Sequence, residues 1–235
     1  MRFKLKQFDK LLNKEISAWV FLKDRVSLKK KSKNKYFPCI TVSRETGSGG
    51  RLAAQLAAKK LGFKYYNKKI VELIVSETKK REGLIQSLDE NGANFLEETI
   101  GILFGTRINS STYFRNLVKV ILALGSKRNS VILGRGGNFI IPSKFGLRVR
   151  VMAPLKYRIK NAMNHEKISL KEAEQRIQET HFQRKNFVRK YFYKNISNAN
   201  YYDLVINTKD LSVDQAAEII VFAFKTKFPK FARQQ

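Results

Sequence analysis

The chain has 235 residues, and its 47 Lys and Arg against 19 Asp and Glu give a net charge of +28. One cysteine, Cys39, excludes an internal disulfide framework and a cysteine metal cluster, and two histidines argue against a histidine metal site or catalytic triad. The charge favours polyanionic partners, namely nucleotides, nucleic acids or acidic membranes. An AT-rich genome, which raises the lysine content without selection for binding, is the alternative explanation. With no secretory signal in view, we expect a cytoplasmic protein.

Residues 1–36 form a separate basic segment, with twelve Lys or Arg and three Asp or Glu. Apolar residues recur there at helical spacing from Leu5 to Leu22, so we expect an amphipathic helix followed by a lysine-rich linker. The apolar run Ile16–Leu22 is much shorter than a membrane span. The helix either packs on the main domain or docks on an acidic surface, such as nucleic acid or a membrane interface.

The strand and helix patterns alternate after residue 37. Short apolar runs predict five strands, over residues 40–42, 63–66, 131–133, 147–152 and 203–207. Helices are expected over 52–61, over 67–78 with Asn67 as cap, through most of 79–128, and after Pro154, Ser169 and Ser212. The last two serines open capping boxes. Such alternation indicates a parallel sheet with helices on both faces, in which ligands bind at the carboxyl ends of the strands.

The stretch from Ile40 to Leu52 combines a strand, a glycine turn and the start of a helix. Glycines allow successive backbone N–H groups to point into one hollow, and the positive end of the following helix favours an anion there. The stretch therefore predicts a phosphate cradle, although a plain strand-to-helix turn is the alternative.

Arginines follow several of the predicted strands. Arg44 and Arg51 flank the glycine turn, Arg135 follows the third strand, and Arg158 lies one turn into the helix after the fourth. A guanidinium matches the geometry of phosphate oxygens, and converging arginines can neutralise a transferring phosphoryl group without a histidine or cysteine nucleophile. Taken singly, each arginine is more often a solvated surface charge.

The motifs taken in order resemble those of the cytidylate kinase-like family, which belongs to the nucleoside monophosphate kinases of the P-loop type. The resemblance is carried by Ile40-Thr-Val-Ser-Arg-Glu-Thr-Gly-Ser-Gly-Gly-Arg51, Gly62-Phe-Lys-Tyr-Tyr66, Val131-Ile-Leu-Gly-Arg-Gly-Gly137, Ala153-Pro-Leu-Lys-Tyr-Arg158 and Tyr202-Asp-Leu-Val-Ile-Asn-Thr208. It covers about residues 38 to 225.

This resemblance implies a three-layer P-loop kinase fold over residues 37–228, with a five-stranded parallel sheet, an acceptor-binding insertion at about 67–128 and a lid at about 165–195. ATP and Mg²⁺ are the implied cofactors. The residues implied to hold the ATP phosphates are Arg44, Gly47, Ser48, Gly49, Gly50 and Arg51. Arg135 would grip the acceptor nucleotide, Arg158 would stand on the helix that leads to the lid, and Arg184 with Arg189 would close over the transferring phosphoryl group.

Four positions depart from these patterns, although glycine at residue 50 is usual in the family that the chain resembles. An ordinary P-loop carries a lysine and a magnesium-binding hydroxyl, and Gly50 and Leu52 stand at those positions. Arg51 or Arg44 can replace the charge of the lysine, and Ser48 offers a hydroxyl. Leu133 and His181 stand where the resemblance leads one to expect aspartates, before the Gly-Arg of the third strand and at the start of the lid motif.

Two functions are consistent with these observations. The first is a kinase that moves the γ-phosphoryl group of ATP to a nucleoside monophosphate such as CMP. The alternative is a kinase-fold module with weakened or absent turnover that binds nucleotide or nucleic acid through its basic surface. A phosphotransferase with an unusual acceptor is a third possibility.

Overall fold

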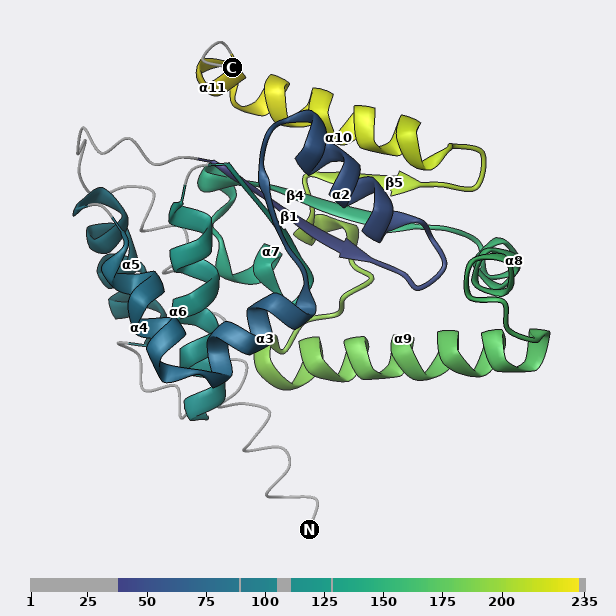
Figure 1. Cartoon of the computed structure of the whole chain (residues 1–235), viewed down its shortest axis with the longest axis horizontal. Helices are drawn as coiled ribbons and strands as arrows, with labels where there is room; N and C mark the ends of the chain where they lie inside the picture. The colour runs from purple at the N-terminus through teal and green to yellow at the C-terminus, as the bar shows by residue number, and fades with distance from the viewer. Residues whose placement is uncertain (1–37, 89, 105–110, 128, 233–235) are drawn as a thin grey trace.

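The computed structural model describes residues 38–88, 90–104, 111–127 and 129–232 (Figure 1). The helix and linker predicted for residues 1–36 lie outside these ranges. None of the helices in the described ranges is both long enough and apolar enough to pass through a bilayer.

Five parallel strands form one sheet in the order β2-β3-β1-β4-β5. Their bounds are β1 Cys39–Arg44, β2 Lys64–Tyr66, β3 Ser130–Leu133, β4 Gly146–Met152 and β5 Leu204–Asn207. The five predicted strands are thus confirmed, with ends shifted by one or two residues. Because all pairs are parallel, every strand delivers its carboxyl end to the same edge of the sheet.

One face of the sheet is covered by α2 (Gly50–Lys60) and α10 (Val213–Lys227) (Figure 1). The alanines of α2, including Ala53 and Ala57, are fully buried, so this helix lies close to the strands. They pack with Ile40, Val42 and other residues of the central strands in one apolar cluster. The glycine turn between β1 and α2 is thereby held between a buried strand and a tightly packed helix.

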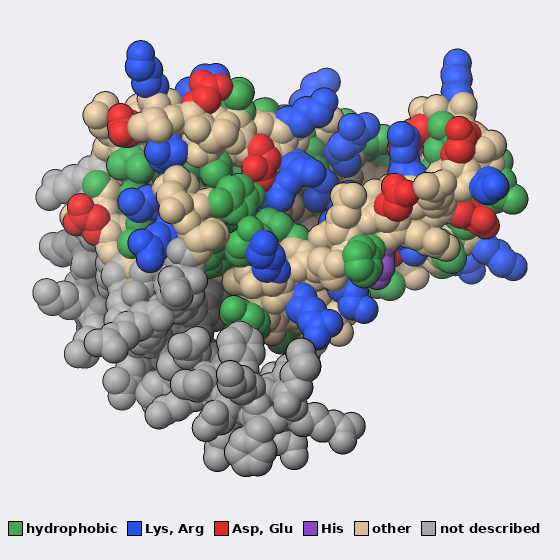
Figure 2. Space-filling view, turned by 90° about the horizontal axis from the view of Figure 1, so that it is seen from below, with side chains coloured by type: hydrophobic (Ala, Val, Ile, Leu, Met, Phe, Trp, Pro, Cys, Tyr) green, Lys and Arg blue, Asp and Glu red, His purple; other side chains and the backbone are tan. Residues whose placement is uncertain are grey.

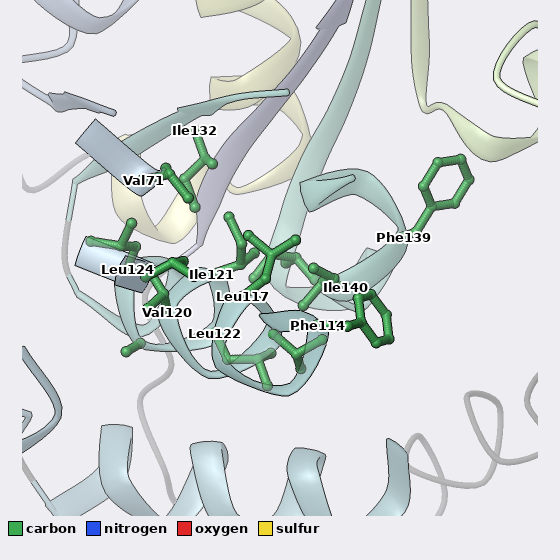
Figure 3. Packing of buried hydrophobic residues seen from close by; sticks show 14 of the residues in the cluster. Val71, Phe114, Leu117, Val120, Ile121, Leu122, Leu124, Ile132, Phe139 and Ile140 are labelled. Atoms are coloured by element: carbon green, nitrogen blue, oxygen red, sulfur yellow. The ribbon is translucent and has the colours of Figure 1, made fainter. Parts of the chain in front are cut away.

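The other face is covered by a larger group of helices. These are α3 (Lys68–Ser76), α4 (Thr78–Gln86), α5 (Glu90–Phe104), α6 (Thr112–Ser126) and the short α7 (Gly137–Ile140). The residues Leu117 and Ile121 of α6 lie at the centre of the cluster that joins these helices to the sheet (Figure 3). The described part of 79–128 is helical as predicted, whereas α7 and two 3-10 turns, at Ser143–Phe145 and Ala199–Tyr201, were not predicted.

A helical hairpin projects from the body of the molecule (Figure 1). It consists of α8 (Leu155–Glu166) and the 23-residue α9 (Leu170–Phe192), and its own small core contains Ala162, Ala173 and Ile177. The predicted capping boxes at Ser169 and Ser212 are both present, and the Asn67 side chain accepts a hydrogen bond from the N–H of Ile70 at 3.1 Å. A last short helix, α11 (Pro229–Ala232), ends the described chain.

Candidate active site

The glycine turn between β1 and α2 is a tight loop. Gly47 and Gly49 adopt left-handed φ angles of 79° and 72°. A Cβ atom on Gly47 would lie 2.3 Å from the carbonyl oxygen of Arg158, and one on Gly50 would lie 2.8 Å from the Cβ atoms of Arg44 and Val151. Glycine is therefore required at 47 by both backbone conformation and space, and at 50 by space alone.

Side chains from distant parts of the chain fix this loop. Thr208, which follows β5, donates its hydroxyl to the carbonyl oxygen of Ser48 at 2.8 Å, and Asn161 of α8 donates to that of Gly47 at 2.9 Å. The N–H of Glu45 donates to the carbonyl oxygen of Val151 at 3.0 Å. The loop carbonyls are thus engaged with the surrounding protein.

The loop N–H groups are less engaged than its carbonyls. Those of Gly47, Gly49 and Arg51 have no hydrogen-bond acceptor among the described residues. Those of Ser48 and Gly50 make only long bonds of 3.4 Å, within the loop. This arrangement leaves amide donors at the amino end of an 11-residue helix, where an anion is stabilised.

The hydroxyl of Ser48 is used inside the loop. It donates to the carbonyl oxygen of Glu45 at 2.9 Å, accepts from the N–H of Gly50, and its residue is 1% exposed. Leu52 carries no hydroxyl, and the described residues contain no group of three or more His, Cys, Asp and Glu side chains able to hold a metal ion. The loop therefore does not fit a magnesium site of the ordinary P-loop kind, and we do not propose Ser48 as its ligand.

A cavity of about 300 Å³ lies beside this loop, at the carboxyl ends of β1 and β3 and under α9. Its lining contains four cationic residues and no Asp or Glu: Arg44, Lys68, Arg135 and Arg184. We call this the cationic cavity. Lys and Arg side chains border the hollow beside the ridge formed by α8 and α9 (Figure 2). Such a lining suits a ligand that carries several negative charges.

Arg184 and Arg44 meet at the loop side of this cavity. Arg184 donates to the main-chain carbonyl oxygen of Arg44 at 2.8 Å. Burial, with the positive charges of neighbouring arginines, lowers the pKa of Arg184 to about 9, and burial lowers that of Arg44 to about 10. Both groups still carry their charge at neutral pH, and each would be stabilised by an incoming anion.

Arg135, which follows β3, also lines the cationic cavity and adopts the left-handed conformation with φ 54°. Its Nε is 2.7 Å from a carboxylate oxygen of Glu72, and its guanidinium lies 5.0 Å from the centre of the Phe187 ring. Tyr113 donates its hydroxyl to the same oxygen of Glu72 at 2.8 Å. Glu72 and Tyr113 thus orient Arg135, and sequence reasoning missed both, although Glu72 is the only acid of α3.

Two of the expected arginines lie elsewhere. Arg158 packs behind the loop, where its Nε is 3.0 Å from the carbonyl oxygen of Ala153 and 3.4 Å from a carboxylate oxygen of Glu45. Arg150, which the sequence did not single out, is 4% exposed and also pairs with Glu45, at 3.3 Å. Arg189 is exposed and does not line the cationic cavity. The cationic cavity therefore brings Arg44, Arg135 and Arg184 together, whereas Arg158 lines a small second pocket that shares Arg44 and Arg184 with it. Arg189 lines neither pocket.

Comparisons with known proteins concern the family and the fold of the chain. Residues 39–210 match the profile of the cytidylate kinase-like family. A cytidylate kinase from Staphylothermus marinus is 29% identical over 183 residues, which cover 77% of this chain and 93% of the relative. A crystal structure of an uncharacterized protein from Eubacterium ventriosum aligns with a TM-score of 0.63 at 20% identity, covering 80% of this chain and 98% of that one.

Proposed function

Because the chain belongs to the cytidylate kinase-like family, we propose that it transfers the γ-phosphoryl group of ATP to a nucleoside monophosphate such as CMP. Family membership supports the coarser role of a nucleotide kinase-like phosphotransferase, and the name of the Staphylothermus marinus relative suggests the acceptor. In this reaction an oxygen of the acceptor phosphate bonds to the γ-phosphorus, the bond from that phosphorus to the β–γ bridging oxygen breaks, and ADP leaves.

The observation that carries the proposal is the juxtaposition of two anion sites. One is the loop with free N–H groups at Gly47, Gly49 and Arg51, which suits the phosphates of ATP. The other is the cationic cavity, which suits the acceptor phosphate. Arg44 and Arg184 lie where the two meet, so their charges fall where the phosphoryl group passes.

Each part of the chain has a definite task in this mechanism. The loop amides hold and orient the phosphates of the donor, and Arg135, set by Glu72, orients the acceptor. Arg184 from the α8–α9 hairpin neutralises charge and helps α9 to exclude water. Magnesium supplies further charge neutralisation when it accompanies ATP, but we derive no step through it because the loop offers no free hydroxyl.

A second candidate is a module that binds nucleotide or nucleic acid without turnover. The absence of a lysine at residue 50 and of a hydroxyl at residue 52 favours it. In this case the basic surface would bind polyanions, and affinity for nucleic acid would fall steeply as salt rises. Removing residues 1–36 would weaken that binding if the N-terminal segment carries it.

A coupled assay with ATP and each nucleoside monophosphate separates the two candidates. We expect turnover with at least one acceptor, CMP first, and its loss in Arg135→Ala. The matched control is Arg176→Ala, because Arg176 is an exposed arginine that pairs with Glu166 on the outer part of the hairpin. No turnover with any acceptor, together with salt-dependent binding of nucleic acid, would favour the binding module instead.

A further inference from the structure

Arg44 has a guanidinium without a partner. Its side chain makes no hydrogen bond and no ion pair with any residue in the described ranges, whereas Arg135, Arg150 and Arg158 each meet a carboxylate. Burial lowers its pKa, and the charge of Arg135 acts in the same direction. A guanidinium has five N–H donors, so a half-buried one without a protein partner costs free energy until an acceptor arrives.

The position of Arg44 is set by two glycines. A Cβ atom on Gly134, at the end of β3, would lie 2.5 Å from an Nη atom of Arg44, so the guanidinium rests against bare backbone there. A Cβ atom on Gly50 would lie 2.8 Å from the Cβ of Arg44. The stem of Arg44 therefore occupies the space that a lysine side chain at residue 50 needs.

We propose that Arg44 supplies, from the end of β1, the cation that the lysine of an ordinary P-loop supplies from the start of the helix. Its guanidinium contacts the phosphoryl group in transit between the loop and the cationic cavity. This inference rests on the proposed function for the identity of the reaction, but not for the anion site itself. It agrees with glycine at residue 50, because a side chain there would meet the Cβ atoms of both Arg44 and Val151.

The first test is a pair of variants at residue 44. We expect Arg44→Met to lower kcat by about 10²–10³-fold, the usual effect of removing one group that stabilises transition-state charge. Added guanidinium ion should restore part of that loss, which a merely structural role would not show. Arg176→Ala serves as the control and should keep kcat within about twofold. A loss below about threefold, or no response to guanidinium, would overturn the proposal.

A binding measurement keeps this inference separate from the proposed function. Calorimetry of the full chain with inorganic pyrophosphate needs no turnover, and Arg44→Met should weaken the affinity by at least about tenfold. If the protein phosphorylates no nucleotide but this loss is seen, the proposed function fails and the anion site at Arg44 stands. If the protein turns over a nucleotide but Arg44→Met changes neither kcat nor the affinity for pyrophosphate, the proposed function stands and the role assigned to Arg44 is wrong.

Discussion

Two groups of charges lie toward opposite ends of the same sheet, and they are built differently. Toward the amino ends of the strands, Asp203 pairs with Arg148 at 2.6 Å and with Lys227 at 2.7 Å, a group we call the Asp203 cluster. Toward the carboxyl ends, the cationic cavity holds Arg44 and Arg184 without a carboxylate in its lining. Paired charges fix the positions of strands, whereas unpaired charges leave free energy to be recovered by a ligand.

The largest expected effect is on activity and tests the cationic cavity. Arg184→Met should lower kcat by about 10²–10³-fold, because charge stabilisation of the transferring group is lost. The melting temperature should change little, because removal of a half-buried cation without a carboxylate partner offsets the loss of its hydrogen bond to the carbonyl oxygen of Arg44. Parallel measurement of kcat and thermal unfolding checks both. If the variant instead keeps its kcat while folded and has a much lower melting temperature, Arg184 stabilises the fold as the Asp203 cluster does, and the contrast between the two groups of charges is lost.

The next largest effect is on stability and tests the Asp203 cluster. Asp203→Asn should lower the free energy of unfolding by about 2 kcal/mol, because Arg148 and Lys227 lose their counter-charge at a partly exposed site. Although burial alone would raise the pKa of Asp203, hydrogen bonds from Arg148 and Lys227 lower it. The stabilisation is thus fully present above the pH range in which carboxyl groups titrate, and it is lost as the pH falls through the lowered pKa of Asp203. Urea unfolding at pH 7 and near pH 3 should show the difference shrinking, with kcat at pH 7 almost unchanged.

A smaller effect concerns alkaline pH. The pKa of Arg184 is lowered to about 9, and a basic group loses its charge above its pKa. We therefore expect kcat/KM, which reports the free enzyme, to fall by about tenfold per pH unit above that value. Circular dichroism over the same range controls for unfolding. A profile that stays flat to pH 10 would show that Arg184 has gained a counter-charge.

The smallest effect separates two arginines of one helix. Arg189 lies five residues beyond Arg184 on α9, yet it is exposed and outside the cationic cavity. Arg189→Ala should change kcat and KM by less than about twofold, measured beside Arg184→Ala under the same conditions. A loss comparable to that of Arg184→Ala would mean that α9 turns Arg189 inward when the site is filled, and would restore the role that the sequence resemblance implied.

The fold was largely predictable because its signals are local. The strands, the capping boxes at Ser169 and Ser212, and the Asn67 cap follow from residue patterns a few positions long. α7 was missed because four residues give no helical periodicity.

The site was less predictable because it depends on direction and on distant partners. The sequence placed arginines after the strands, but only the structure shows that Arg158 pairs with Glu45 and does not line the cationic cavity. The pairing of Arg135 with Glu72 joins residues more than sixty positions apart, and no local pattern indicates it. Whether a cation is paired or free is likewise a property of the folded surroundings, which is why Arg44 and Arg184 could be named but not distinguished from Arg189.

The unbroken length of α9 has a mechanical consequence. Its 23 residues span about 34 Å, and its last turns are anchored by Val188 and Phe192 in the main core. Its partner α8 is anchored as well, because Asn161 donates to the carbonyl oxygen of Gly47 and Arg158 pairs with Glu45. The hairpin is therefore tied to the body through both of its helices. Any tilt of the hairpin would pull on the glycine turn through α8 and on Arg184 through α9 at the same time.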